Sequence, residues 1–286
     1  MPLLYRAWVA LSALLLPFIA RREVSKLRRA GMSVDRAHEK LGNASVRRPT
    51  GAPLIWFHSA SVGESLSVLA LITRMGVSLP QAQFLMTSGT ATSATLVGKR
   101  LPPRCVHQFA PLAAGGPLKR FLRHWKPDAA VLEESELWPQ MLRKTHDTGA
   151  AMAMVNARLS EKSLAQWKKQ PALARYLLEV FDLILTQNDA MAENMVAIGA
   201  PAARVARGVN LKSMAGPLQV DEDALFEARA ALGHRPVWIA SSTHAGEEEI
   251  VLAAHKSLVE RWPDLHLILA PRDPERGDAV ASLILA

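Results

Sequence analysis

The sequence predicts an α/β protein built on parallel β-sheets. Three observations support this fold class. Short apolar segments alternate with longer segments of helical periodicity, polar residues follow most of the apolar segments, and 49% of the 286 residues are hydrophobic, which is enough for a sizeable core. The sequence has 21% charged residues and no long low-complexity tract, so we expect a folded protein.

Taken in order, the segments predict a first α/β region and then a second. In the first region, strand segments are expected at 53–60, 83–89, 106–112, 128–134, 150–158 and 181–187, and helices at 64–75, 90–101, 116–125 and 138–149. A polar, Gly/Pro-containing segment at 216–224 predicts a linker. The second region has strands at 236–242 and 265–272 and helices at 247–262 and 275–286.

The N-terminal segment Ala7–Ala20 is apolar and lies between Arg6 and Arg21. It is shorter than the roughly 20 residues that cross a bilayer, and Pro17 is expected to interrupt a simple helix. A basic cluster comes after it instead of a small-residue cleavage site. We interpret the segment as a membrane anchor or an interfacial helix beside anionic headgroups, with the rest of the chain in the cytoplasm. The alternative is a buried core helix with a basic last turn.

The formal net charge is +8, and much of the excess lies early, at Arg21–Arg29 and at Arg47 and Arg48. Such an excess suits nucleic acid, an anionic membrane or phosphorylated substrates. Basic residues interleaved with aromatic residues are absent, as is any nucleic-acid-binding motif, which argues against nucleic acid. The one cysteine, Cys105, excludes a disulfide framework, and the nine histidines lack the spacing of zinc ligands.

Polar residues follow six of the predicted strands. In an open parallel sheet, ligands bind beyond the carboxyl ends of the strands, so these groups predict one cleft. They are Ser59–Glu64, Thr87–Thr90, Glu133–Glu136, Asn156–Ser160, Ser241–His244, and Arg272 with Asp273.

Three of these places have two interpretations each. Glu64 begins a helix after Gly63, so it is either a general base at the cleft floor or an acidic first-turn residue stabilised by the helix dipole. Glu133–Gln140 carries three carboxylates, which either form a solvated turn or face an oxocarbenium-like transition state. Ser241–Glu249 either holds a phosphate or only caps a helix. The chain has no GxGxxG, no P-loop and no GxSxG motif.

Seven motifs in a fixed order carry a family resemblance. They are HSASVGE (58–64), TSGTATSA (87–94), ESELWP (134–139), VNARLSEKS (155–163), NLK (210–212), SSTHAGEEE (241–249) and PRDPER (271–276). Together they resemble the 3-deoxy-D-manno-octulosonic acid (Kdo) transferases, which add Kdo to the lipid A precursor. The resemblance covers essentially the whole chain.

The resemblance implies a GT-B fold of two Rossmann-like domains and an inverting transfer from CMP-Kdo, with no metal and no further cofactor. The implied organisation is a membrane-associated segment and basic linker at 1–48, an acceptor-binding domain at 49–215, and the start of a nucleotide-sugar-binding domain at 216–286. The implied partners are CMP-Kdo, the lipid A precursor and an anionic membrane surface, at the cytoplasmic face of the bacterial inner membrane.

Residue by residue, the resemblance implies Glu64 as the catalytic base and Glu134 and Lys212 as transition-state stabilisers. Arg272 matches a CMP-binding residue, since an arginine fork suits a phosphate. Pro271, Ser242 and Thr243 are expected beside it in the nucleotide site.

Two alternatives stay open at this point. The family continues beyond residue 286, and two strand–helix units are fewer than a nucleotide-binding domain usually has, so the second domain is expected to be incomplete. The chain could therefore be a truncated, catalytically inactive, membrane-associated relative that retains only the acceptor domain. The other alternative is a GT-B sugar-nucleotide enzyme of another kind, such as an epimerase.

Overall fold

The computed structural model describes residues 1–214 and 220–285; the side chains of Lys212, Met214 and Pro274 also lie outside the described part. The chain divides into two compact units, Met1–Gly216 (unit 1) and Pro217–Ala286 (unit 2). Each unit is an α/β structure with a parallel sheet, as the sequence predicts.

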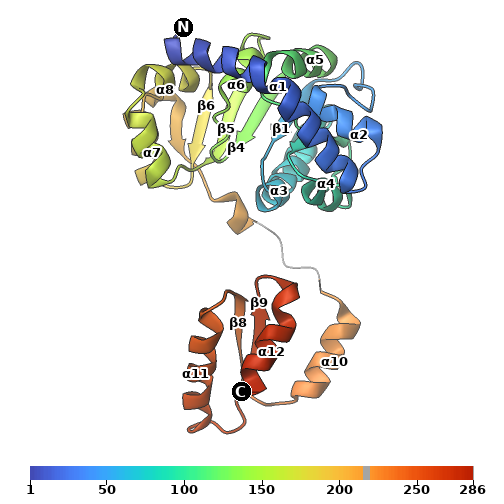
Figure 1. Ribbon diagram of the computed structural model, residues 1–286, viewed down its shortest axis with the longest axis vertical. Coiled ribbons are helices and arrows are strands. Elements are labelled where there is room, and N and C mark those ends of the chain that lie inside the picture. Colours follow the sequence, from blue (N-terminus) through green and yellow to red (C-terminus); the bar gives the residue numbers. More distant parts are fainter. Residues whose placement is uncertain (215–219, 286) are drawn as a thin grey trace. The chain divides into compact units, whose positions relative to one another are not determined.

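Unit 1 contains a seven-stranded parallel sheet in the order β3-β2-β1-β4-β5-β6-β7 (Figure 1). Its strands are β1 (Leu54–His58), β2 (Gln83–Ser88), β3 (Cys105–Phe109), β4 (Ala129–Glu133), β5 (Ala151–Ala157), β6 (Leu183–Thr186) and β7 (Val205–Arg207). The strand order reverses between β1 and β4, which are hydrogen-bonded neighbours although β2 and β3 lie between them in the sequence. In doubly wound sheets such a switch point is where ligands bind.

The helices of unit 1 connect these strands and cover the sheet. They are α1 (Leu3–Arg29), α2 (Val34–His38), α3 (Val62–Ser78), α4 (Ala91–Gly98), α5 (Gly115–Trp125), α6 (Pro139–His146), α7 (Glu161–Lys168), α8 (Pro171–Leu178) and α9 (Asp189–Ala197). Short 3-10 turns occur at η1 (Glu39–Leu41), η2 (Ala202–Arg204) and η3 (Leu211–Met214).

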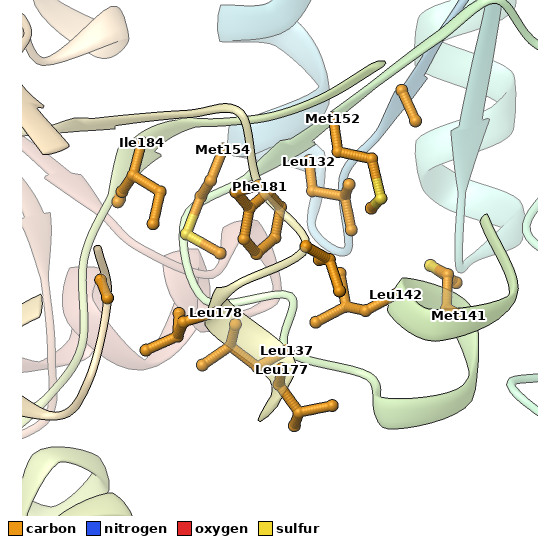
Figure 2. Close-up of a cluster of buried hydrophobic side chains, with 14 of the residues drawn as sticks. Leu132, Leu137, Met141, Leu142, Met152, Met154, Leu177, Leu178, Phe181 and Ile184 are labelled. Atoms are coloured by element: carbon orange, nitrogen blue, oxygen red, sulfur yellow. The ribbon is translucent and has the colours of Figure 1, made fainter. Parts of the chain in front are cut away.

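Alternation along each strand divides the core of unit 1 into two clusters, one on each face of the sheet. In β1, Leu54 and Trp56 belong to one cluster, whereas Ile55 and Phe57 belong to the other. Successive side chains of a strand point to opposite faces, so both faces of this sheet are covered. Figure 2 shows part of the first cluster, where side chains of β4, β5 and β6 meet those of α6 and α8.

Helix α1 lies along unit 1 and contacts α2, η1 and α6 (Figure 1). Tyr5 and Leu27 are its buried residues, and Gln140 of α6 donates a hydrogen bond to Ser12. The helix is long and apolar enough to cross a membrane, but only 6% of its most apolar window is buried. The alternative of a buried core helix is therefore wrong.

Pro17 does not interrupt α1, contrary to the sequence prediction, because the helix is continuous from Leu3 to Arg29. Proline removes the N–H that would bond to the carbonyl four residues earlier. That carbonyl belongs to Ala13, and both residues are exposed, so solvent can satisfy the freed group.

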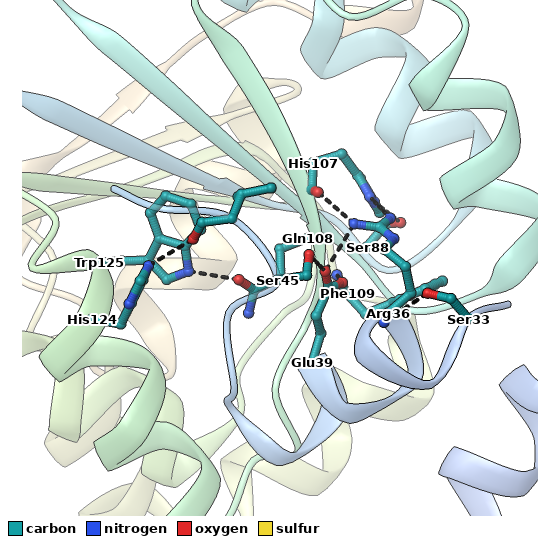
Figure 3. Close-up of polar contacts among 11 residues, drawn as sticks. Ser33, Arg36, Glu39, Ser45, Ser88, His107, Gln108, Phe109, His124 and Trp125 are labelled. Carbon is teal, nitrogen blue, oxygen red and sulfur yellow. Dashed lines mark hydrogen bonds and ion pairs between the residues drawn. The ribbon is translucent and has the colours of Figure 1, made fainter. Parts of the chain in front are cut away.

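A buried polar cluster fixes the segment after α1 against the sheet (Figure 3). Glu39 is fully buried and accepts hydrogen bonds from Arg36 (3.0 Å), from the Phe109 backbone N–H (2.7 Å) and from Ser45. Arg36 also donates to His107 Nδ1 at 2.8 Å, so the proton of that imidazole is on Nε2 and faces Ser88 at 2.9 Å. Burial lowers the pKa of His107 to about 3, with Arg36 and Lys40 adding to the effect, so the ring is neutral.

Unit 2 contains a two-stranded parallel sheet of β8 (Val237–Thr243) and β9 (His266–Pro271). Its helices are α10 (Glu222–Leu232), α11 (Glu247–Val259) and α12 (Gly277–Leu285), with a 3-10 turn η4 (Pro274–Arg276). The predicted linker at 216–224 lies largely outside the described residues, and its last residues are helical because Asp221 caps α10. Glu248 and Arg276 form a two-point ion pair at 3.0 and 3.1 Å, which ties α11 to η4.

Candidate functional site

The candidate site lies at the carboxyl edge of the unit 1 sheet, where β1, β4 and β5 end. Glu64 follows β1, Glu133 and Glu134 close β4, and Asn156 lies near the end of β5. Because β1 pairs with β4 and β4 pairs with β5, these residues share one edge at the switch point of the sheet. Four of the six predicted polar groups therefore belong to unit 1, and the other two belong to unit 2.

Glu64 forms a complete capping box with Ser61 at the start of α3. One carboxylate oxygen accepts from the Ala60 N–H at 2.9 Å and the Ser61 N–H at 3.4 Å. The other accepts from the Ser61 hydroxyl at 2.8 Å. The helix-capping interpretation is thus realised, and the partly exposed carboxylate can still accept one more hydrogen bond, since each oxygen can accept twice and three bonds are made. Capping holds the carboxylate in place and does not exclude a second acceptor role.

Three buried serines support the turn that carries Glu64. The Ser65 hydroxyl donates to the Ser61 carbonyl at 2.7 Å, which commits its only proton. The hydroxyls of Ser59 (2.8 Å) and Ser93 (2.9 Å) must therefore donate to the Ser65 oxygen. This network links the end of β1 to the first turns of α3 and α4, so the position of Glu64 is determined by three elements.

Glu133 lies beneath the site as a fully buried carboxyl group. One of its oxygens lies 2.6 Å from the Ser67 hydroxyl, which also donates to the Glu64 carbonyl, and accepts from Asn156 at 3.3 Å. The other oxygen has no hydrogen-bond partner in the described part of the chain. Burial, with smaller effects of the charges of Glu64 and Glu134, raises the pKa of Glu133 to about 8 against the lowering effect of the contacts with Ser67 and Asn156. The group is therefore largely protonated at neutral pH.

Glu134 and Asn156 both have left-handed backbone conformations, with φ of 55° each. Such conformations are costly for residues other than glycine, and they concentrate at functional sites. At Asn156 the strand bulges, because the register of β5 with β6 shifts between Met154 and Ala157. The bulge directs the Asn156 amide to the carboxylates, where it donates to Glu133 and, at 3.5 Å, to Glu134.

The Asn156 side chain also connects this edge to η3. Its oxygen accepts from Gln187 at 2.9 Å and from the Leu211 N–H at 3.3 Å. Turn η3 contacts α3, the helix that begins at Glu64. The backbone of Lys212 therefore lies beside the predicted catalytic residues, and its side chain lies outside the described residues.

A second polar chain borders the same edge. His58 lies 3.3 Å from Glu136, and Trp138 donates to the same Glu136 oxygen at 2.5 Å. Burial raises the pKa of Glu136, but the bonds to His58 and Trp138 outweigh burial and hold it below its usual range. His58 Nε2 therefore faces Glu136, and His58 Nδ1 lies 3.0 Å from the Thr87 hydroxyl.

In unit 2 the four residues predicted for nucleotide binding come together at the carboxyl end of its sheet. Thr243 pairs with Pro271, and the Arg272 N–H donates to the Thr243 carbonyl at 2.9 Å. Ser242 has a left-handed backbone with φ of 59°, which coincides with a bulge between Ser241 and Thr243. The side chains of Ser242 and Arg272 are exposed, so they are accessible to a ligand.

The sequence motifs point to Glu64 and Glu134 but give no individual role to Glu133, Asn156 or Ser67. The signal in the sequence that could have identified Glu133 is a carboxylate as the last residue of an apolar strand. Among the residues that the structure describes, no group of three His, Cys, Asp or Glu side chains could hold a metal ion.

A comparison with family models gives one match over most of unit 1. The model described as 3-deoxy-D-manno-octulosonic-acid transferase matches residues 35–215.

Comparison with individual curated proteins points to the same family. The chain is 33% identical over 248 residues to a probable mitochondrial 3-deoxy-D-manno-octulosonic acid transferase of Arabidopsis thaliana, covering 85% of this chain and 55% of that protein. It is 36% identical over 230 residues to the 3-deoxy-D-manno-octulosonic acid transferase of Rickettsia felis, covering 79% of this chain and 48% of the relative. The chain thus spans about half the length of the curated relatives it matches.

Solved structures show the fold alone, since their sequence identities are low. A UDP-GlcNAc 2-epimerase from Neisseria meningitidis bound to UDP-GlcNAc has a TM-score of 0.52 at 10% identity, over 81% of this chain and 69% of that one. A glycosyltransferase from Rickettsia africae has a TM-score of 0.51 at 10% identity, over 82% and 65%. The architecture is therefore of the GT-B type that these two proteins share.

Proposed function

The chain belongs to the 3-deoxy-D-manno-octulosonic acid (Kdo) transferase family, and on that premise we propose that it takes part in inverting transfer of Kdo from CMP-Kdo to the lipid A precursor. Unit 1 binds the acceptor, and unit 2 contributes to binding of the nucleotide-sugar. The transfer takes place at the cytoplasmic face of the inner membrane.

In the proposed step, the Glu64 carboxylate accepts the proton of an acceptor hydroxyl. The hydroxyl oxygen then forms a bond to the anomeric carbon of Kdo, while the bond from that carbon to the CMP phosphate oxygen breaks. The electron pair of the broken bond leaves with CMP, and the configuration at the carbon inverts. Glu134 faces the positive charge that develops on the sugar ring, and Lys212 opposes the negative charge on the departing phosphate.

The observation that carries this proposal is the pair of carboxyl groups at the switch point of the sheet. Glu64 is partly exposed and oriented by the capping box, whereas Glu133 behind it is buried and largely protonated. Two carboxyl groups with such different environments support different roles, Glu64 as a proton acceptor and Glu133 as a neutral group. A neutral Glu133 also spares Glu64 the repulsion of a second charge.

The nucleotide residues of the proposal are Ser242, Thr243, Pro271 and Arg272. They lie together at the carboxyl end of β8 and β9, where a parallel sheet binds ligands. The exposed Arg272 guanidinium suits the CMP phosphate. We expect Arg272→Ala to weaken CMP binding by about tenfold or more, measured by calorimetry, since a charge-assisted bond contributes about 1.5–3 kcal/mol. Unchanged affinity would remove Arg272 from the nucleotide site.

The test of the base uses Glu64→Gln, because glutamine also completes a capping box. The variant should fold normally and lose at least about a hundredfold in Kdo transfer, the usual contribution of a general base. Transfer is measured as the release of CMP from CMP-Kdo that depends on the lipid A precursor as acceptor. Ser61→Ala is the matched control, since it weakens the cap and leaves the carboxylate. A Glu64→Gln variant with near-normal transfer would contradict the proposal.

The alternative is a membrane-associated relative that binds the acceptor and does not catalyse transfer. The chain spans about half the length of the relatives it matches, so transfer by this chain is itself tested directly. Binding of the lipid A precursor without CMP release by the unaltered chain would support this alternative over catalysis.

A further inference from the structure

A cavity of about 380 Å³ lies between α1 and the carboxyl edge of the unit 1 sheet. Helix α1 contributes Trp8, Ser12, Leu16 and Ile19 to one wall. The segment after β3, residues 110–114, forms another wall, and Trp138 and Met141 complete the lining on the α6 side. The lining is mainly apolar, and the volume is within the range of small-molecule sites.

Lys40 is a buried basic side chain in this mainly apolar lining. Its side chain is 6% exposed, and the described part of the chain places no carboxylate within ion-pair distance of it. The neighbouring Glu39 is committed to Arg36, Ser45 and Phe109, as Figure 3 shows. Burial lowers the pKa of Lys40 to about 8; the charge of Lys26 lowers it too, and the charges of Glu23 and Glu39 raise it by less than burial lowers it. A buried ammonium group without an anion is costly, so the cavity suits a ligand that brings one.

The other polar groups of the cavity already have partners. His58 and Glu136 contact each other, and Ser12 accepts from Gln140. In the described lining, the Lys40 ammonium group has no hydrogen bond or ion pair, and it lies 5.9 Å from the centre of the Phe109 ring, so it can still pair with an anionic ligand.

The cavity also adjoins the candidate catalytic residue. Ala60 lines it, and the Ala60 N–H donates to the Glu64 carboxylate at 2.9 Å. On the opposite side, α1 exposes Leu14 and Phe18, with 72% and 76% of their surface accessible. A lipid whose headgroup lies at Glu64 would thus place an acyl chain in the cavity beneath α1.

We propose that this cavity binds an acyl chain of an anionic, phosphate-bearing lipid, with Lys40 pairing with the anionic group. The identification of that lipid with the acceptor rests on the proposed function, whereas binding of the amphiphile does not. A free phosphate would leave the apolar walls unused, and a neutral hydrocarbon would leave Lys40 unpaired.

The test uses brominated dodecyl phosphate below its micelle concentration, because bromine quenches the fluorescence of Trp8 and Trp138 in the cavity wall. We expect saturable quenching by the unaltered chain. Lys40→Met should weaken binding of the alkyl phosphate by about tenfold or more and leave binding of brominated dodecanol unchanged. Lys40→Arg, which retains the charge, should restore much of the affinity.

A matched pair of variants on α1 tests whether the acyl chain of the ligand occupies the cavity. Leu16→Trp fills the cavity and should reduce binding of both brominated probes, whereas Leu14→Trp places the same side chain on the exposed outer face and should leave both unchanged. The proposal would be overturned by any one of three results. These are equal affinity of Lys40→Met and the unaltered chain for the alkyl phosphate, no effect of Leu16→Trp, and displacement of the probe by inorganic phosphate.

Competition with the probe shows whether the cavity prefers the acceptor lipid or an ordinary membrane phospholipid. The lipid A precursor should displace the probe more effectively than phosphatidylglycerol in the same neutral detergent, and the reverse order would overturn the assignment to the acceptor. Glu64→Gln should bind the probe normally. Probe binding without any transfer by the unaltered chain would therefore contradict the proposed function alone, and transfer without probe binding would contradict the cavity alone.

Discussion

At the scale of single residues, the site combines carboxyl groups in contrasting surroundings. Glu64 is held at a helix N-terminus by three hydrogen bonds, and it is partly exposed. Glu133 is buried with one oxygen unpartnered in the described part of the chain, an arrangement that favours the protonated form. Asn156, whose backbone is left-handed, donates a hydrogen bond to Glu133 and holds its carboxyl group in place. Glu64, Glu133 and Asn156 together therefore give the two carboxyl groups their different surroundings.

The buried Glu133 predicts a specific pH dependence of stability. Its pKa rises from 4.5 to about 8 on folding, so between these pH values the folded state keeps a proton that the unfolded state has lost. Stability should therefore fall as pH rises through this window. Glu133→Gln removes the ionisable group and keeps a side chain of the same shape that can hydrogen-bond to Ser67. Its urea unfolding midpoint should exceed that of the unaltered chain increasingly from about pH 5 to about pH 8; a constant difference would contradict the prediction.

At the scale of secondary-structure elements, the attachment of α1 and η1 to the sheet decides the shape of the site. Helix α1 packs through Tyr5 and Leu27 and exposes much of its remaining apolar surface. Turn η1 ends at Gly42, whose φ is 84°. These two elements form the cavity wall that contains Lys40.

Gly42 tests the attachment of η1. A Cβ atom there would lie 2.0 Å from the Pro117 carbonyl oxygen, in a backbone region that L-residues avoid. Gly42→Ala should lower the free energy of unfolding by about 3 kcal/mol or more. Gly31→Ala is the control: its φ is 82° but nothing lies within 4 Å, so it should cost only about 1–2 kcal/mol. Equal losses in thermal unfolding would indicate that the close approach does not matter.

The exposed face of α1 predicts membrane binding. Replacing Leu14 and Phe18 by serine should weaken sedimentation with anionic phospholipid vesicles by about tenfold or more, since each large side chain contributes about 1.5–3 kcal/mol when buried. Val77→Ser is the control, because Val77 is 80% exposed at the end of α3. If the double variant sediments as well as the control, α1 is not the membrane-binding element.

At the scale of the whole molecule, the two units differ in how well they bury apolar residues. Unit 1 has two large clusters on the two faces of its sheet. Among the described residues of unit 2, only one apolar residue, Val280, is buried. Ile239 and Ile250 are 62% and 70% exposed. The units should therefore differ in stability, because burial of apolar surface is the main source of folding free energy.

Hydrogen exchange tests this difference. Backbone amides of β1 and β4 should exchange at least about a hundredfold more slowly than those of β8 and β9, since slow exchange reflects cooperative opening of well-packed elements. Adding CMP should slow exchange in unit 2 if the nucleotide residues are assigned correctly. Equal protection of the two sheets without CMP would contradict the proposed difference.

The sequence by itself determined the fold class, the order of the main strands and helices, and the family. Strand and helix periodicities are local, so the predicted strand 83–89 and β2 at Gln83–Ser88 nearly coincide. The sequence also placed Glu64 at a helix start, because the Ser61–Glu64 spacing that defines a capping box is local too. Shorter elements such as α8 and α9 were missed, since brief helices give weak periodic signals.

Only the tertiary structure decided which residues meet and in what surroundings. The pairing of β1 with β4 brings Glu64 near Glu133, and the bulge at Asn156 turns its amide toward both carboxyl groups at the end of β4. The burial of Glu133 and the cavity around Lys40 likewise depend on elements far apart in the chain. Proton affinity and ligand fit arise from such non-local packing, which is why no local pattern in the sequence could reveal them.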